Sequence, residues 1–239
     1  MCRLPLGILP PMKKILLALL VLVATINTAS AQFEIGLKVS PSITRLRAES
    51  PADHAFTSDG SQVGFGGGLV VDYFFGENYA FSTGLLLTGK GGSIKYTDVS
   101  NGVTGQSFVV QQKFNTQYLG VPLTVKLFTN EIAPATRLYF QVGGSLNVPI
   151  GTRINSSKFY KDPATNNENK ASDYVYFFDA DALVSVGTEY QMAKSTKLFA
   201  GISYNRGLVD IDHYFEKSRG FKDVTIKNSS FALDLGIKF

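Results

Sequence analysis

The chain ends in Phe231-Ala232-Leu233-Asp234-Leu235-Gly236-Ile237-Lys238-Phe239, a stretch whose side chains alternate strictly in character. Odd positions carry apolar residues, and even positions carry small or polar ones. Successive side chains of a β-strand point to opposite faces, so this alternation predicts a strand with one apolar and one polar face. Either a soluble core or a lipid bilayer covers such an apolar face, and the rest of the sequence distinguishes between the two.

The N-terminus has the features of a cleaved signal peptide. Lys13-Lys14 forms a basic segment, residues 15–26 are apolar, and residues 29–31 (ASA) form a small-residue cleavage site. The apolar run is shorter than the ~20 residues with which a helix spans a bilayer. We therefore predict an upstream extension plus a cleaved signal peptide over residues 1–31, followed by one exported domain over residues 32–239.

Removal of the leader changes what the composition implies about partners. Arg3, Lys13 and Lys14 are the charged residues before the cleavage site, so the net charge falls from +4 to +1, too low to indicate nucleic-acid binding. The single cysteine, Cys2, is also lost, which excludes thiol and disulfide chemistry in the exported part. No later run approaches 18 consecutive apolar residues, so no transmembrane helix is predicted.

From residue 33 onward the sequence is a series of alternating segments. We predict eight strands, at residues 33–39, 63–75, 79–96, 108–129, 135–153, 173–190, 197–210 and 226–239. The first, third, fifth and seventh connections are long and polar, whereas the others have about 3 to 6 residues. This alternation is typical of an up-and-down meander whose loops are elaborated at one end.

The polar face of these strands distinguishes a membrane barrel from a soluble one. A soluble barrel carries long charged side chains outside, whereas a membrane barrel turns its apolar face to lipid. The polar face here is rich in glycine, with scattered charges at Asp72, Lys126, Asp179, Asp181, Glu189, Lys197, Asp234 and Lys238. Because such residues suit a narrow polar interior, we predict an all-β, eight-stranded antiparallel transmembrane barrel with short periplasmic turns and long outer loops. A lipocalin-like soluble barrel is the alternative.

Aromatic residues gather near the predicted strand ends. They are Tyr73, Phe75, Tyr79, Phe81, Tyr174, Tyr176, Tyr190 and Phe239. Tyrosine and phenylalanine at both ends of the strands are typical of the aromatic girdles at membrane interfaces. Ordinary β-propensity explains any one of them equally well, so both interpretations stay open.

Three glycine-containing motifs resemble catalytic or nucleotide-binding signatures without their context. Residues 84–90 have the spacing of a phosphate-binding loop, but Gly91 stands where a magnesium-binding Ser or Thr is needed. Residues 64–68 lack the strand–turn–helix setting of a dinucleotide fingerprint. Residues 201–205 fail the nucleophile-elbow pattern at their last position. We therefore predict no catalytic and no cofactor-binding residues.

The two histidines of the exported part fall in predicted outer loops. His54 follows Asp53, and His213 lies close to Asp210 and Asp212, so a metal or acid–base site at the loop end is conceivable. Solvated loop residues are the simpler interpretation, because no predicted strand holds these groups in a fixed geometry. We predict no metal site.

Asp179 and Asp181 lie two residues apart on one predicted strand, so both side chains point into the lumen. A proton or cation site is one interpretation of this pair. The other is an ion-pair network with Lys126, Lys197 or Lys238, since an unpaired charge in a narrow interior is costly. We favour the ion-pair network.

Several segments together carry a family resemblance. They are the leader MKKILLALLVLVATINTASAQ with the FEIGLKVS that follows it, YLGVPL at residues 118–123, YNRGL at residues 204–208 and the terminal LGIKF. These segments resemble PorT-family outer-membrane β-barrel proteins, and the resemblance covers residues 32–239. It implies an eight-stranded barrel domain in the outer membrane of a Gram-negative cell, and no functional residue is transferred by it.

The resemblance also implies partners and a class of function. Outer-membrane lipid and, during insertion, the barrel assembly machinery are the implied partners, with Phe239 as a candidate recognition element for that machinery. We expect a non-enzymatic integral outer-membrane protein that acts in envelope structure or in interaction through its outer loops. A component of a protein secretion apparatus, as the family name suggests, and a narrow solute pore are the alternatives; an enzyme ranks last.

Overall fold

The computed structural model describes residues 32–50, 55–99, 107–221 and 223–239. The predicted leader at residues 1–31 lies outside the described residues. By its internal contacts the chain divides into residues 1–33 and 34–239, and the barrel belongs to the second unit. No helix in the described part of the chain is long and apolar enough to cross a membrane.

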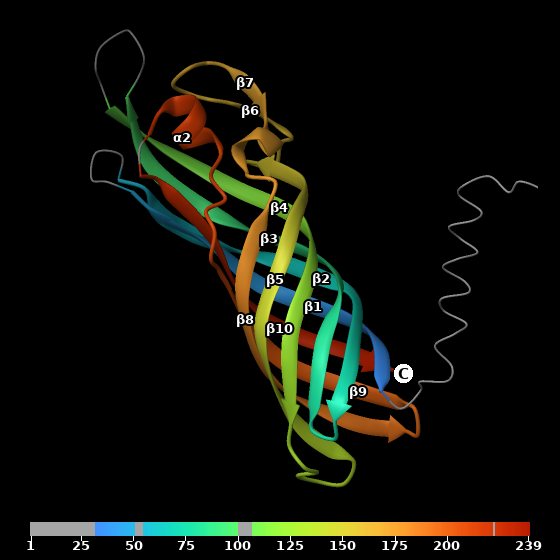
Figure 1. Ribbon diagram of the computed structural model, residues 1–239. Helices are drawn as coiled ribbons and strands as arrows, with labels where there is room; N and C mark the ends of the chain where they lie inside the picture. The colour runs from blue at the N-terminus through green and yellow to red at the C-terminus, as the bar shows by residue number, and fades with distance from the viewer. Residues whose placement is uncertain (1–31, 51–54, 100–106, 222) are drawn as a thin grey trace, which may run out of the picture. The chain divides into compact units, whose positions relative to one another are not determined.

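Eight strands close into an antiparallel barrel (Figure 1). They are β1 (Phe33–Glu49), β2 (Thr57–Gly76), β3 (Tyr79–Val99), β4 (Ser107–Phe128), β5 (Thr136–Ile154), β8 (Asp179–Ala193), β9 (Thr196–Gly207) and β10 (Thr225–Lys238). Their order around the ring is β1-β10-β9-β8-β5-β4-β3-β2, so the strands follow one another as in an up-and-down meander. The predicted fold class is confirmed.

The C-terminal strand closes the barrel as predicted. β10 pairs antiparallel with β1, with Val39 opposite Leu235. At the lip, the N–H of Phe239 donates to the carbonyl of Ile35 at 2.8 Å, and the N–H of Ile35 donates to the carbonyl of Phe239 at 3.2 Å. The Phe239 side chain is 61% exposed on the outward face. Its recognition by an assembly machinery stays a prediction.

The strands are longer at the loop end than the sequence pattern indicated. β1 begins at the predicted residue but continues to Glu49, and β2 begins at Thr57, six residues early. A tilted strand crosses lipid in about 9–11 residues, so the remainder extends beyond the bilayer. Residues 45–62 look like a loop in sequence because the outward face of a strand in water carries polar side chains.

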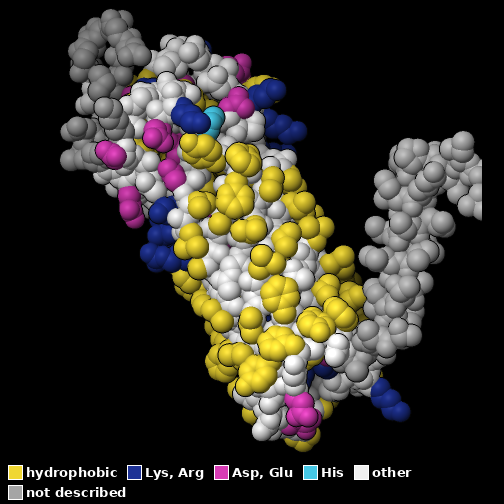
Figure 2. Space-filling model, in the orientation of Figure 1, with side chains coloured by type: hydrophobic (Ala, Val, Ile, Leu, Met, Phe, Trp, Pro, Cys, Tyr) yellow, Lys and Arg dark blue, Asp and Glu magenta, His cyan; other side chains and the backbone are white. Residues whose placement is uncertain are grey.

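Large apolar side chains cover the outward face of every barrel strand. Burial alternates along β4: Leu123 and Leu127 are exposed, whereas Thr124 and Lys126, which lie between them in the sequence, are buried. Figure 2 shows the hydrophobic side chains as a broad band, with charged side chains beyond it at both ends. An apolar exterior over a polar interior excludes a lipocalin-like soluble barrel.

The predicted aromatic girdles are confirmed only in part. Phe75 and Tyr79 are exposed beside the β2–β3 turn and stack with ring centroids 6.1 Å apart. Tyr190 is likewise exposed near the turn that follows β8. Tyr174, in contrast, is 2% exposed and faces no lipid, so its assignment to a girdle is wrong.

Two predicted outer loops fold into structure above the barrel. Residues 155–178 contain the hairpin β6 (Phe159–Lys161) and β7 (Glu168–Lys170) and the 3-10 helix η2 (Ala171–Tyr174), and residues 208–224 contain α2 (Tyr214–Arg219). We call these two segments the outer cap. The loops predicted at residues 154–172 and 211–225 are therefore present, but they contain short elements and buried residues that the sequence pattern did not indicate. The predicted sixth strand, from residue 173, also starts too early, because its first residues belong to this cap.

Candidate functional site

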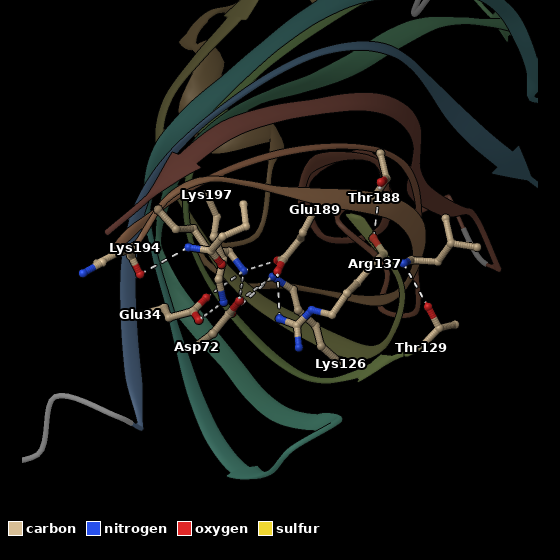
Figure 3. Close-up of polar contacts among 12 residues, drawn as sticks. Glu34, Asp72, Lys126, Thr129, Arg137, Thr188, Glu189, Lys194 and Lys197 are labelled. Carbon is tan, nitrogen blue, oxygen red and sulfur yellow. Dashed lines mark hydrogen bonds and ion pairs between the residues drawn. The ribbon is translucent and has the colours of Figure 1, made fainter. Parts of the chain in front are cut away.

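The lumen is filled by charged side chains at the end with the short turns (Figure 3). We call this group the basal cluster; it consists of Glu34, Asp72, Lys126, Arg137, Glu189, Lys197 and Lys238. These residues come from seven of the eight barrel strands, all except β3. The cluster therefore ties the strands together across the interior.

Lys238 is the centre of the basal cluster. It is 1% exposed, and its Nζ lies 2.5 Å from Asp72 Oδ2 and also forms an ion pair with Glu189. Lys126 Nζ approaches the same Asp72 oxygen at 2.9 Å. Arg137 Nη2 lies 3.7 Å from Glu189 Oε2. Each buried carboxylate of the cluster thus faces at least one cation, as a low-dielectric interior requires.

Aromatic rings occupy the space that the charges leave. Lys238 Nζ lies 5.5 Å from the centroid of the Phe199 ring, and Lys126 Nζ lies 5.3 Å from that of Tyr139. Arg137 stacks over Phe128 at 4.7 Å. These are cation–π distances, so the rings stabilise the cations as well as filling the lumen.

A second group, the central cluster, lies nearer to the loops and is organised around Lys90. Lys90 Nζ lies 3.1 Å from Asp179 Oδ2 and forms a second ion pair with Asp181. Asn228 Nδ2 donates to Asp179 at 3.0 Å, and Asn147 Nδ2 donates to Asp181 at 2.9 Å. Both carboxylates are therefore held by one cation and by amide donors from β5 and β10.

The ion-pair interpretation of Asp179 and Asp181 is confirmed, but the predicted partners are wrong. Lys126, Lys197 and Lys238 belong to the basal cluster, which also contains Glu189, a residue of the same strand β8 as Asp181. At about 3.4 Å per residue, the eight residues from Asp181 to Glu189 span roughly 27 Å along the tilted strand. Lysines at the basal level cannot reach Asp181, whereas Lys90 lies at its level.

The remaining space in the middle of the lumen is small. A cavity of about 60 Å³ lies between the central cluster and the pair formed by Lys38 and Asp234, whose Nζ and Oδ1 atoms are 3.0 Å apart. Ser40 Oγ donates to the same Asp234 oxygen at 2.6 Å. Such a volume suits a few water molecules, since each requires ~10–15 Å³ of this kind of space.

The outer cap closes the loop end of the barrel with an aromatic core. Phe56 stacks on Tyr96 with ring centroids 4.7 Å apart and meets Phe215 of α2 edge-on at 4.9 Å. Tyr174 stacks on Tyr214 at 3.9 Å. Because strand residues and cap residues share this core, the cap is part of the folded domain and does not behave as a set of independent loops.

Arg219 forms ion pairs that connect the cap to the barrel wall. Its guanidinium lies 2.7 Å from Asp98 on β3 and 2.7 Å from Asp162 in the cap. Burial raises the pKa of Asp162, but hydrogen bonds from Tyr214, from the Ala164 N–H and from Arg219 outweigh it and leave that pKa below its usual value. Burial disfavours the charged form of Arg219, yet the two carboxylates raise its pKa above the ordinary value. Asp162 and Arg219 are therefore both charged at neutral pH.

A histidine–carboxylate site at the loop end was one interpretation of the sequence, and only His213, Asp210 and Asp212 of that group fall among the described residues. His54 and Asp53 lie outside them. The Asp210 carboxylate accepts hydrogen bonds from the backbone N–H groups of Asp212 and Ile226. The Asp212 carboxylate accepts three hydrogen bonds from backbone N–H groups of the first turn of α2. His213 Nδ1 lies 3.1 Å from the carbonyl of Asp173. In the described part of the chain, no group of three or more His, Cys, Asp or Glu side chains is arranged to hold a metal.

The glycine motifs all lie inside barrel strands, at residues 64–68 in β2, 84–91 in β3 and 201–205 in β9. Lys90, which had the position of a phosphate-binding lysine, is instead the cation of the central cluster. Its place on the inward face follows from the alternation with Leu85 and Leu87 outside. That alternation was present in the sequence and indicates that Lys90 faces the lumen, but it does not indicate its partners.

Comparison with known proteins assigns the family. A model of the outer membrane protein beta-barrel domain matches residues 27–213. The chain belongs to this family. Membership, together with the apolar band and polar lumen, places this outer-membrane barrel in the envelope of a Gram-negative cell. None of the curated proteins matches the chain.

Several solved structures resemble this barrel at low identity. OprG of Pseudomonas aeruginosa is 11% identical, with a TM-score of 0.45 over 87% of this chain and 97% of the other. Neisserial surface protein A is 14% identical, with a TM-score of 0.44 over 86% and 95%. Ail, the attachment invasion locus protein of Yersinia pestis, is 10% identical, with a TM-score of 0.36 over 87% and 99%. No role is transferred from these likenesses.

The central cluster generates the first prediction. Lys90→Met keeps the length of the side chain but leaves Asp179 and Asp181 buried without their cation. Breaking a buried ion pair in this way destabilises a fold by about 3–5 kcal/mol. We expect a loss of that order in the free energy of unfolding, measured by urea titration of the barrel in lipid vesicles.

Two further variants control this experiment. Lys95→Met removes a lysine from the exposed, outward face of β3, and we expect a change within about 0.5 kcal/mol. Adding Asp179→Asn and Asp181→Asn to Lys90→Met neutralises the orphaned carboxylates and should recover part of the loss. Wild-type stability in the Lys90→Met variant would contradict the role given to Lys90.

The cap generates a prediction about pH. Burial, together with the charge of Asp210, outweighs the backbone hydrogen bonds and raises the pKa of Asp212 from its ordinary 3.8 to about 6. A raised pKa stabilises the folded state at low pH, and this contribution is lost as the pH rises from about 4 through 6. The free energy of cap opening should therefore fall, by on the order of 3 kcal/mol. Hydrogen exchange at the amides of Phe215 and Glu216, corrected for the intrinsic rate, measures it.

Asp212→Asn is the control for this pH dependence. Its side-chain oxygen still accepts hydrogen bonds from the first turn of α2, but it does not titrate. We expect most of the pH dependence to disappear, leaving the smaller contribution of Asp210, whose pKa burial also raises. If the free energy of cap opening changed equally with pH in the wild-type protein and in the Asp212→Asn variant, Asp212 would not be the titrating group.

Proposed function

We propose that this protein is a non-enzymatic, non-conducting membrane anchor that holds the outer cap at the cell surface, where it serves envelope structure or contact with other molecules. The observation that carries this proposal is the filled lumen. The basal cluster, the central cluster and the aromatic core of the cap succeed one another along the barrel. The cavity in the middle of the lumen measures about 60 Å³, and a hollow of about 330 Å³ lies beside Arg137, Glu189 and Lys197 at the short-turn end. An interior filled in this way is better suited to a structural role than to the conduction of ions or solutes.

The chemistry of the charged groups supports a role without catalysis. A catalytic acid or base needs access to a substrate, but Asp179, Asp181 and Glu189 are buried and paired with lysines. Asp212 is buried and bound to the backbone of α2. The presence of these buried carboxylates is explained by the contacts that they make in the folded barrel and cap, without a catalytic role.

The order of the cap supports a role in display. Loops that serve only to connect strands have no need of a shared aromatic core, of β6 and β7, or of the Arg219 ion pairs. A preorganised surface binds with less entropic cost than a mobile loop. Within the family we place this chain with the PorT-type barrels, on the sequence segments quoted above.

The first test of this proposal is electrical. Purified protein reconstituted in planar bilayers should show no steady conductance steps, because ion-paired side chains and aromatic rings occupy the lumen. A porin with sixteen or more strands, whose lumen is open, is the positive control in the same bilayer. Regular conductance steps from the wild-type barrel would contradict the proposal and favour a narrow solute pore.

The second test asks whether the cap faces the outside of the cell. The exported part of the chain has no native cysteine, so single cysteines give clean labelling sites. Lys217→Cys, exposed on α2, should react with a membrane-impermeant maleimide on intact cells. Lys194→Cys, exposed on the β8–β9 turn, should react only after the outer membrane is permeabilised. If Lys194→Cys reacted on intact cells and Lys217→Cys reacted only after permeabilisation, the proposal that the cap faces the outside of the cell would be wrong.

A further inference from the structure

A groove lies on the outside of the barrel beneath the β6–β7 hairpin. Its volume is about 650 Å³, roughly ten times that of the cavity in the lumen. The outward faces of β4 and β5 contribute Asn115, Gln117, Ile150, Gly151 and Arg153, with the buried Thr152 beside them on β5. The cap contributes Lys158, Phe159, Lys170 and Ser172. The groove is thus formed jointly by the barrel wall and the outer cap.

The groove begins where the apolar band ends. On β4 the outward residue Leu119 is followed, in the direction of the loops, by Gln117 and Asn115. On β5 the outward apolar run ends at Ile150. Since the long loops of outer-membrane barrels face outward, the groove lies at the level of the headgroups of the outer leaflet.

The side chains of the groove suit a ligand with one anionic and one apolar part. Its lining includes three cations, Arg153, Lys158 and Lys170, and no carboxylate. None of the three forms an ion pair with another described residue. Phe159 of the hairpin is 53% exposed and Ile150 of β5 is 55% exposed, so apolar surface adjoins the cations, and Ile150 continues it toward the membrane.

We propose that this groove is a binding site for a phosphorylated lipid of the outer leaflet. Arg153, Lys158 and Lys170 bind the phosphate, because basic clusters at the membrane surface attract anionic headgroups and arginine matches phosphate geometry with paired donors. Ile150 and Phe159 contact the start of the acyl chains. The lipid thereby connects the cap to the membrane and orients the β6–β7 hairpin above it.

Native mass spectrometry of the delipidated barrel in detergent tests this site. Short-chain phosphatidic acid is the probe, short-chain phosphatidylcholine is the zwitterionic control, and inorganic phosphate is the control without acyl chains. We expect phosphatidic acid to bind most tightly. Combining Arg153→Gln, Lys158→Gln and Lys170→Gln should weaken its binding by on the order of a hundredfold, because each basic residue near an anionic surface contributes several-fold.

A matched variant separates the groove from the general charge of the barrel. Arg45, Lys95 and Lys227 lie on the loop-end halves of β1, β3 and β10, outside the groove lining. Changing these three to glutamine removes the same charge, and we expect it to weaken binding only slightly. All substituted side chains are at least partly exposed, and heat-modifiable gel migration verifies that both variants fold.

Three results would overturn the proposal. Equal losses in the two triple variants would show diffuse attraction to the loop end and no specific groove. Inorganic phosphate binding as tightly as phosphatidic acid would show a site for soluble anions. Failure of the wild-type barrel to prefer phosphatidic acid over phosphatidylcholine would exclude an anionic lipid site altogether.

Phe159→Ala should lower the affinity for the lipid but not for inorganic phosphate.

Discussion

The requirement that every buried charge meet an opposite charge governs the interior of this barrel. An eight-stranded barrel is just wide enough for its own side chains, so a charged group in the lumen is removed from bulk water. Lys238 on β10 pairs with Asp72 on β2, past the intervening strand β1, and Lys90 on β3 pairs with Asp179 and Asp181 on β8. Such pairs add little stability of their own, but they make each strand depend on partners in others.

The bilayer sets a second constraint, which inverts the polarity of a strand along its length. Within the band, β4 has Leu123 outside and Thr124 inside; beyond it, Lys113 is outside and Phe114 inside. In lipid the apolar face must point outward, whereas in water it must point inward. One continuous strand therefore contributes to a membrane barrel at one end and to the core of a soluble-type cap at the other.

The cap and the groove beneath it both depend on this inversion. Because the strands rise beyond the bilayer, they carry Tyr96 and Phe114 to a level where Tyr174 and Phe215 of the cap cover them. The same extension places Arg153 above the lipid band, beside the β6–β7 hairpin. A barrel whose strands ended at the membrane surface would have neither the core nor the cationic groove.

The sequence by itself determined the number and order of the barrel strands, the closing partner of the C-terminal strand and the side that faces lipid, because a period of two is a local property of the chain. It also identified Asp179 and Asp181 as inward-facing. Only the tertiary structure decided that Lys90 pairs with them, since this depends on the level of each residue along tilted strands and on their order in the ring. It alone decided that residues 155–178 and 208–224 fold, because their aromatic residues are distant in sequence and gain stability only by packing on one another and on the barrel.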